Sequence, residues 1–218
     1  MAILPEGRLW RKANWGCMQL VLASTSPRRQ QMLEALNLRF TVVAPRPEAE
    51  KPLPRHLPLA RLQQLLPEVS EGKARDVAER CQQYSLVVGA DTVVYCQGQV
   101  LGKPGGALVA RRYLEKLSGR AHRVLSSITV HDTQTGLVQS AVEVTEVRFR
   151  KLGEREIERY VASGEPLDKA GSYGIQGWGG LLVESIKGRQ DNVIGFPLAT
   201  LEEVLKTFGR SLYDFARV

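Results

Sequence analysis

The sequence predicts a mixed α/β protein, a twisted sheet flanked by helices. Short apolar segments typical of strands alternate along the chain with segments of helical spacing. The 218 residues are 43% apolar and 24% charged, a composition that excludes disordered chains, collagen-like repeats and disulfide miniproteins. No apolar run of about 18 residues occurs, so we expect a soluble protein without a membrane-spanning helix. We expect one domain over residues 18–218, because a chain of this size can bury one large core.

The first elements form a β-α-β unit. Residues 20–23 are apolar and predict a strand, residues 27–36 have helical spacing, and residues 40–43 predict a second strand. Residues 44–58 hold five of the eleven prolines, which favours a stiff extended loop. Helical spacing returns over residues 59–83.

The rest of the chain continues this alternation. A glycine-rich segment at 164–180 interrupts it, and we expect irregular structure there. The remaining predictions are strands at 86–90, 93–95, 124–130, 142–149 and 181–184, with 93–95 either continuing or pairing with 86–90, and helices at 107–117, 153–162 and 197–208.

Residues 1–17 differ from the rest of the chain. They contain Trp10 and Trp15 but neither the apolar core nor the cleavage site of a signal peptide. We expect an extension outside the domain, either disordered or packed on a surface, or translation that starts at Met18. The cysteines, at positions 17, 81 and 96, form no CxxC pair, so neither a disulfide framework nor a zinc ribbon is indicated and we expect a cytoplasmic protein.

The charge balance favours an anionic partner. Thirty basic residues against 23 acidic residues give a net charge of +7, which suits nucleic acid or nucleotide phosphates. The basic residues are scattered and only 6% of the chain is aromatic. A stacking surface for single-stranded nucleic acid is therefore not indicated, and nucleic acid is the weaker alternative.

An anion site is predicted where the first strand leads into the first helix. Ser26 stands at the expected N-cap, Pro27 at the first helical position, and Arg28 and Arg29 follow. A helix start with unpaired amides attracts phosphate, and arginine can donate to phosphate in a bidentate manner. The alternative is a well-capped helix whose two arginines are solvated.

Several common catalytic motifs are missing. The sequence contains no GxxxxGK[ST], HExxH or GxSxG motif, and the glycines at 174–180 do not fit a dinucleotide fingerprint. ATPases of the Walker type and classical dehydrogenases are thereby excluded. The three histidines, His56, His122 and His131, do not suggest a metal centre, and we expect surface or hydrogen-bonded roles for them.

Asp91 is the main candidate for catalysis. It follows the predicted strand at 86–90, so its carboxylate would lie at the strand's end, where it could bind a divalent cation or accept a proton from water. A turn or cap aspartate is the alternative. Lys103 follows a short hairpin later and is suited to phosphate, and Glu48 and Glu50 in the proline-rich loop could bring a second carboxylate to the same edge.

The glycine-rich segment holds the last candidates. Asp168 and Lys169 lie where backbone can approach a ligand closely. Gln176 has both a donor and an acceptor, which suits recognition of a base edge, although an exposed loop amide is the alternative.

These segments together resemble the Maf nucleotide pyrophosphatases. The resemblance covers the chain from Met18 to about Phe208. The matching segments are LASTSPRR at 22–29, GADTVV at 89–94, LGKP at 101–104, LSG at 117–119 with His122, SGEPLDKAG at 163–171, YGIQG at 173–177 and NVIGFPL at 192–198.

The resemblance implies a fold related to the inosine triphosphatases, a homodimer, and hydrolysis of nucleoside triphosphates to monophosphate and pyrophosphate with Mg²⁺ or Mn²⁺. By position, Asp91 resembles the residue that activates water, and Glu48 with Asp91 would hold the metal. Ser26, Arg29, Lys73 and Lys103 resemble phosphate-handling residues, and Arg28, Thr92 and Gln176 resemble residues that select the base.

Within this family the segments at 168–171 and 174–177 look like the dTTP/UTP branch, with modified pyrimidine triphosphates such as 5-methyl-UTP or pseudo-UTP as further substrates. A 7-methyl-GTP pyrophosphatase and a non-catalytic regulator linked to septum inhibition remain alternatives. Two positions depart from the pattern: Glu48-Ala49-Glu50 replaces adjacent acidic residues, and Ser126 replaces a common Thr.

Overall fold

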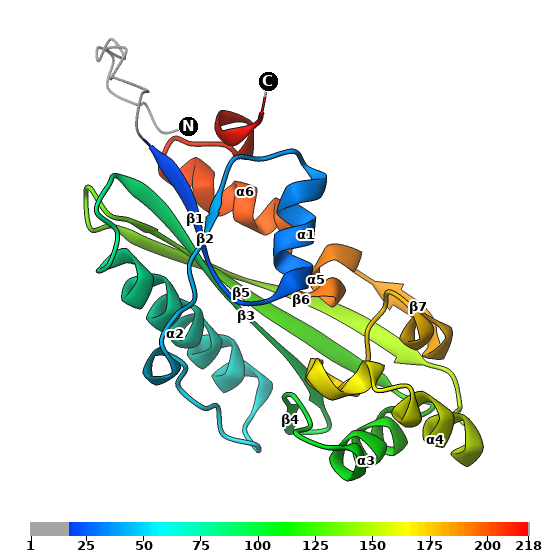
Figure 1. Cartoon of the computed structure of the whole chain (residues 1–218). Helices are drawn as coiled ribbons and strands as arrows, with labels where there is room; N and C mark the ends of the chain where they lie inside the picture. Colours follow the sequence, from blue (N-terminus) through cyan, green and yellow to red (C-terminus); the bar gives the residue numbers. More distant parts are fainter. Residues whose placement is uncertain (1–17, 218) are drawn as a thin grey trace, which may run out of the picture.

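The computed structural model describes residues 18–217 and confirms the mixed α/β fold, a seven-stranded sheet with helices on both faces (Figure 1). The expected N-terminal extension, residues 1–17, lies outside the described residues. The strands are β1 (Gln19–Ala23), β2 (Thr41–Val42), β3 (Ser85–Cys96), β4 (Gln99–Leu101), β5 (Ala121–Asp132), β6 (Val138–Phe149) and β7 (Val183–Lys187). Their order is β2-β1-β3-β5-β6-β7, with β4 paired to β3.

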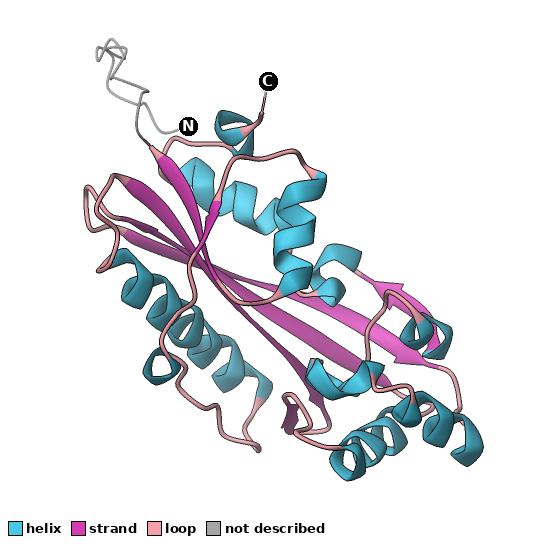
Figure 2. Cartoon of the chain, in the orientation of Figure 1, coloured by secondary structure: helices cyan, strands magenta, loops and turns pink. Residues whose placement is uncertain are grey.

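The helices divide between the two faces of the sheet. Those described are α1 (Pro27–Ala35), α2 (Leu59–Ala78), α3 (Ala107–Leu117), α4 (Glu154–Ala162), α5 (Gln190–Ile194) and α6 (Leu198–Thr207), with 3₁₀ turns η1 (Pro47–Ala49), η2 (Glu165–Asp168), η3 (Ala170–Ser172), η4 (Trp178–Leu182) and η5 (Leu212–Phe215). Helix α2 lies on one face, whereas α1 and α6 cover one end of the other face and α3 and α4 its other end (Figures 1 and 2). None of these helices combines the length and the apolar character that crossing a membrane requires.

Two separate apolar clusters underlie the two groups of helices on the shared face. One packs Leu33 of α1 and Leu201 of α6 against Val88 of β3. The other packs Leu114 of α3 against Val94 near the end of the same strand. Burying apolar surface stabilises each group by about 25 cal/mol for every Å² removed from water. Because the two groups are anchored at different points of β3, they leave the middle of the strand accessible between them.

Strand β3 differs from the prediction at its centre. The segments predicted as strands at 86–90 and 93–95 form one continuous strand, because β5 pairs with it in unbroken antiparallel register from Leu86 to Tyr95. The prediction that Asp91 lies at a strand end is therefore wrong: Asp91 lies in the middle of a twelve-residue strand.

The other differences are local. Strand β2 has two residues rather than four, and both are exposed at the sheet edge. The glycine-rich segment forms the turns η2, η3 and η4, the strand predicted at 181–184 lies at 183–187, and the five-residue helix α5 was not predicted.

One edge of β3 pairs with β5 and the other pairs with β1 and β4. The second edge contains a gap without a pairing strand, and the candidate site lies at this gap. Strand β1 pairs with β3 only as far as the match of Ala23 with Gly89, and β4 pairs from Val94 onward. Residues 90–93 therefore have no strand neighbour on that edge. We call this stretch the notch. Because side chains alternate along a strand, Asp91 points to the α2 face and Thr92 to the face of α1.

Candidate active site

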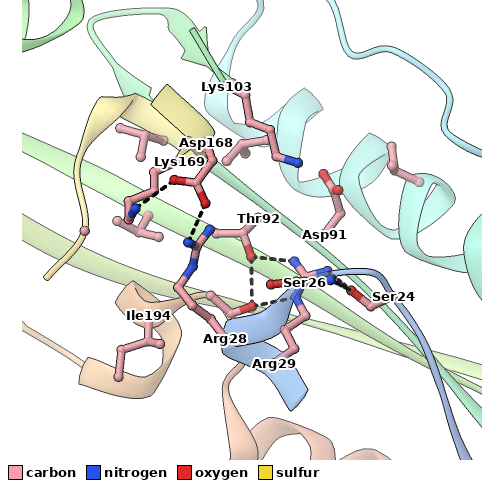
Figure 3. Close-up of a pocket in the computed structure, with 18 of the residues that line it drawn as sticks. Ser24, Ser26, Arg28, Arg29, Asp91, Thr92, Lys103, Asp168, Lys169 and Ile194 are labelled. Carbon is pink, nitrogen blue, oxygen red and sulfur yellow. Dashed lines mark hydrogen bonds and ion pairs between the residues drawn. The ribbon is translucent and has the colours of Figure 1, made fainter. Parts of the chain in front are cut away.

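A cavity of about 830 Å³ opens over the notch. Its walls come from the start of α1, the middle of β3, the loop after β4, helix α2, and the segment from η2 to Gln176. The cavity brings together ten of the predicted site residues: Ser26, Arg28, Arg29, Lys73, Asp91, Thr92, Lys103, Asp168, Lys169 and Gln176. Figure 3 shows the ammonium group of Lys103 pointing into this space. Glu48 is exposed on η1 and does not line the cavity, whereas Glu50 does.

Asp91 forms the acidic centre of the cavity. Its side chain is 20% exposed, and its Oδ1 accepts a hydrogen bond of 2.6 Å from Lys73 Nζ. The same ammonium lies 3.3 Å from Glu50 Oε1. Lys73 is buried, so a charged partner is needed to offset its lost hydration. One buried cation thus holds two carboxylates at the cavity wall.

The close approach of α2 to β3 explains how Lys73 reaches Asp91. A Cβ atom built on Gly89 would lie 2.1 Å from the Ser70 carbonyl oxygen and 2.9 Å from the Ala74 nitrogen. Only a residue without a side chain allows α2 to lie at this distance. Because Lys73 lies between Ser70 and Ala74 on the helix, and Asp91 lies two residues after Gly89 on the same face, the glycine brings the ion pair into contact.

The guanidinium group of Arg29 donates hydrogen bonds to protein atoms around the notch. Its Nη1 donates to the Ala90 carbonyl oxygen at 2.8 Å and to Ser24 Oγ at 3.3 Å, and its Nε and Nη2 donate to Gly195 O and Thr92 Oγ1. Burial lowers the pKa of Arg29 and the charge of Asp91 opposes that shift, but guanidinium stays protonated in proteins at neutral pH. Four of its five N–H groups are thus directed to protein atoms, and one on Nη2 remains for a ligand.

The start of α1 has the predicted form. Ser26 is the N-cap and Pro27 follows at the first helical position. The Ser26 side chain makes no capping hydrogen bond, and the Ser26 amide instead donates to Ser24 Oγ at 3.1 Å. The hydroxyl of Ser26 and the unpaired amides of the first turn therefore face the cavity as donors for an anion.

Arg28 and Asp168 form an ion pair across the cavity. Arg28 Nη1 on α1 lies 2.9 Å from Asp168 Oδ2 on η2, and Lys169 Nζ donates to the other carboxylate oxygen at 2.7 Å (Figure 3). Burial alone would raise the pKa of Asp168, but the hydrogen bonds from Lys169 and Arg28 outweigh it and lower that pKa to about 2. Asp168 is thus a fixed negative charge that orients two cations.

Thr92 has partners on its own face of the sheet. Its Oγ1 lies 2.9 Å from Ser126 Oγ and donates to Gly195 O at 3.1 Å. Ser126 retains the hydroxyl of the expected Thr, so the substitution leaves this contact possible. The prediction missed Gly195, whose carbonyl accepts from both Thr92 and Arg29 and whose φ of 112° favours glycine. The sequence feature that could have indicated this role is the position of Gly195 directly after the segment that forms α5.

Two carboxylates beside the notch have the chemistry that a hard divalent cation needs when phosphate oxygens and waters complete its coordination. Among residues 18–217, no cluster of three His, Cys, Asp or Glu side chains could hold a metal by itself. Mg²⁺ commonly binds through one or two carboxylates, several waters and phosphate oxygens. Asp91 and Glu50, held by the same lysine, supply two carboxylates of that kind.

His122 is a hydrogen-bonded core residue. Its Nε2 lies 2.9 Å from the hydroxyl of Tyr173, and its ring packs edge-on against Phe149. Burial lowers the pKa of His122 to about 4 and outweighs the opposing effect of the nearby backbone of Arg120. The imidazole is therefore neutral near pH 7, and of the two roles expected from the sequence His122 has the hydrogen-bonded one rather than the surface one.

Comparisons with known proteins agree with this architecture. The chain matches the family described as Maf-like protein over residues 19–208. It is 47% identical over 191 residues to the dTTP/UTP pyrophosphatase of Moorella thermoacetica, and this alignment covers 88% of this chain and 95% of that protein. The dTTP/UTP pyrophosphatases of Dictyoglomus thermophilum and Halalkalibacterium halodurans are 42% and 44% identical, and the alignments cover 89% and 88% of this chain and 98% and 97% of theirs. The chain belongs to the Maf-like protein family.

Proposed function

We propose that the protein is a nucleoside triphosphate pyrophosphatase that hydrolyses dTTP and UTP to the monophosphate and pyrophosphate. The observation that carries the proposal is the partly exposed carboxylate of Asp91 in a cavity lined by lysine and arginine side chains from α1, α2 and the loop after β4. An acidic residue among cations is the arrangement that hydrolysis of a polyanion needs. The relatives named dTTP/UTP pyrophosphatase support the choice of nucleotides.

The reaction is a single displacement at the α-phosphorus. Asp91 accepts a proton from the attacking water, a new P–O bond forms, and the bond from the α-phosphorus to the bridging oxygen breaks. Pyrophosphate leaves with that electron pair, and no covalent bond to the protein forms. Lys73 orients Asp91, while Lys103, the Ser26 hydroxyl and the amides at the start of α1 bind phosphate oxygens.

A divalent cation, Mg²⁺ or Mn²⁺, belongs to this proposal. We assign Asp91 and Glu50 as its protein ligands, in place of the pair Glu48 and Asp91 expected from the sequence, because Glu50 and not Glu48 lies at the cavity wall beside Lys73. When bound, the cation would neutralise charge on the phosphates. We assign contact with the base to Arg28 and Gln176, which line the cavity, and Thr92 binds Arg29 and Gly195 at the wall of the same cavity.

The proposal includes the setting in which the enzyme acts. Its substrate is a cellular nucleotide and its cysteines form no CxxC pair, which supports a cytoplasmic protein. The family resemblance supports a homodimer, and sedimentation at micromolar concentration measures that state. Pyrimidine triphosphates carrying small modifications, such as 5-methyl-UTP and pseudo-UTP, are further candidate substrates.

The decisive assay measures pyrophosphate release from a panel of triphosphates with Mg²⁺ or Mn²⁺. We expect dTTP and UTP to be preferred over dATP and 7-methyl-GTP. Preference for 7-methyl-GTP would favour the other branch of the family. No turnover of any triphosphate, together with salt-sensitive nucleic-acid binding, would favour a non-catalytic regulator.

The Asp91→Asn variant tests the proton acceptor. The amide keeps the size of the side chain but cannot take the proton, so we expect kcat to fall by about 10²–10⁴-fold. The melting temperature should fall as well, because the buried Lys73 loses a charged partner, while the circular dichroism spectrum should stay that of the folded wild type. Glu184→Gln, at a surface carboxylate paired with Arg148 on β6, is the matched control and should remain fully active. Retained activity in Asp91→Asn removes Asp91 from this role.

A further inference from the structure

Two side chains, those of Tyr160 and Glu165, form hydrogen bonds with the backbone of the loop that carries Gln176. We call residues 174–179 the base loop. Its two ends meet, since a Cβ atom on Gly179 would lie 2.3 Å from the Gly174 carbonyl oxygen and 2.5 Å from the Tyr160 hydroxyl. Gln176 is exposed at the far end of this loop and lines the cavity. Its position therefore depends on what fixes the two ends.

Glu165, on η2, binds one end of the base loop through its carboxylate. Oε2 accepts from the Trp178 amide at 3.0 Å, and Oε1 accepts from the Gly179 amide at 3.1 Å. Hydrogen bonds from backbone amides to an ionised carboxylate are stronger than those between neutral groups. Glu165 lines the cavity, and both of its carboxylate oxygens accept hydrogen bonds from the loop.

Tyr160, on α4, connects the other end to the same carboxylate. Its hydroxyl donates to Glu165 Oε1 at 3.0 Å and accepts from the Gly174 amide at 3.2 Å. Burial raises the pKa of Tyr160, so the hydroxyl keeps the proton that it donates. We call these two residues the Tyr160–Glu165 clamp. It joins both ends of the base loop to α4 and η2.

The glycines of the loop fit this clamp. Gly177 has a φ of 86°, and a Cβ atom there would lie 2.9 Å from Glu165 Oε2. A side chain at Gly174 would meet the Lys169 stem at 2.7 Å, and Lys169 Nζ in turn donates to the Glu165 backbone oxygen at 2.6 Å. The backbone therefore folds closely around Glu165 and Lys169.

We infer that Glu165 is a positioning residue for nucleotide selection: it holds the base loop so that Gln176 meets the pyrimidine edge, without touching the reacting phosphates. The inference rests on the proposed pyrophosphatase function. Its chemistry requires a carboxylate, because two backbone amides and a hydroxyl all donate to it. A glutamine would present an N–H group to one of these donors.

The experiment compares Glu165→Gln with wild type and with Glu158→Gln, an exposed α4 carboxylate paired with Arg111. For Glu165→Gln we expect the KM for dTTP and UTP to rise about tenfold, kcat to stay within about threefold, and the kcat/KM preference for dTTP over dATP to fall about tenfold. Tyr160→Phe should move these quantities in the same direction by less. Glu158→Gln should match the wild type.

Hydrogen exchange supplies a readout that is independent of activity. Amides of residues 174–180 should exchange faster in Glu165→Gln, with no change elsewhere in the chain. Faster loop exchange with unchanged preference for dTTP over dATP would overturn the inference, as would an equal loss of kcat for every nucleotide. If the wild-type protein releases no pyrophosphate from dTTP or UTP, the proposed function fails first and this inference fails with it.

Discussion

His122 makes the stability of the protein depend on pH. Its pKa is about 4 in the folded protein, where it is buried against Phe149 and Tyr173, and 6.5 as the ordinary value. Between pH 4 and pH 6.5 the histidine is protonated in the unfolded chain but neutral in the folded protein. Protonation therefore favours the unfolded chain, and the free energy of unfolding, which is unaffected by this group above pH 6.5, decreases as the pH falls toward 4.

We therefore predict that the free energy of unfolding falls by up to about 3 kcal/mol more in the wild type than in His122→Gln between pH 6.5 and 4. Urea unfolding at a series of pH values measures this difference. Parallel pH profiles of the two proteins would show that His122 does not titrate with folding.

For some residues the sequence alone predicted the role, whereas for others the role depends on which residues they contact in the folded chain. Asp91, Ser26 and Lys103 were predicted from residue type and local position, and they line one cavity. Arg29 was predicted as a phosphate ligand, yet its partners Ala90 and Gly195 lie far away in sequence. Such contacts form only in the folded chain, so no local pattern could indicate them.

The choice between Glu48 and Glu50 illustrates the same limit. Both stand in the proline-rich loop, and the sequence does not say which one reaches the cavity wall. The backbone of η1 leaves Glu48 exposed, and Glu50 reaches Lys73. Lys73 was expected only through the family resemblance, because a lysine in an amphipathic helix is more often solvated.

The contact between α2 and β3 determines the geometry at Asp91. We predict that Gly89→Ala destabilises the protein by about 1–3 kcal/mol, since the added Cβ would collide with the backbone of α2 at Ser70 and Ala74. We also expect activity to fall, because any outward shift of α2 separates Lys73 from Asp91.

Gly153→Ala is the matched control. Gly153 is the N-cap of α4 with a φ of −83° and has open space around its Cα, so alanine should cost only the modest loss of an N-cap glycine and lower the melting temperature by less than Gly89→Ala does. Equal thermal stability of Gly89→Ala and the wild type would show that α2 can move without cost.

The elements themselves were largely predictable, except where pairing between distant segments decides them. Helices α1, α3 and α4 begin and end close to the expected positions because their spacing is local information. Strand β3 runs through Asp91 because β5 pairs with it along ten residues. The polar pair Asp91-Thr92 interrupts the apolar pattern, and only the pairing of the folded sheet overrides that interruption.

The net positive charge of the chain should direct the substrate to the cavity. The chain carries +7, and a triphosphate is a strong anion, so long-range attraction raises the association rate at low salt. We predict that kcat/KM for dTTP falls several-fold between about 50 and 500 mM salt while kcat changes little, because salt screens the approach and not the chemistry within the cavity.

Potassium chloride at constant free divalent cation is the appropriate titration. Because the substrate's metal complex also responds to salt, the metal concentration has to stay saturating throughout. A kcat/KM that does not change with ionic strength would contradict electrostatic steering, and a parallel fall in kcat would indicate an effect on the folded protein.

In the proposed mechanism, a water molecule deprotonated by Asp91 attacks the α-phosphorus directly. Hydrolysis of dTTP in ¹⁸O-enriched water, followed by mass spectrometry of both products after a single turnover, measures where the new oxygen goes. We predict one ¹⁸O atom in the thymidine monophosphate and none in the pyrophosphate. Label in the pyrophosphate would place the attack at the β-phosphorus and contradict this mechanism.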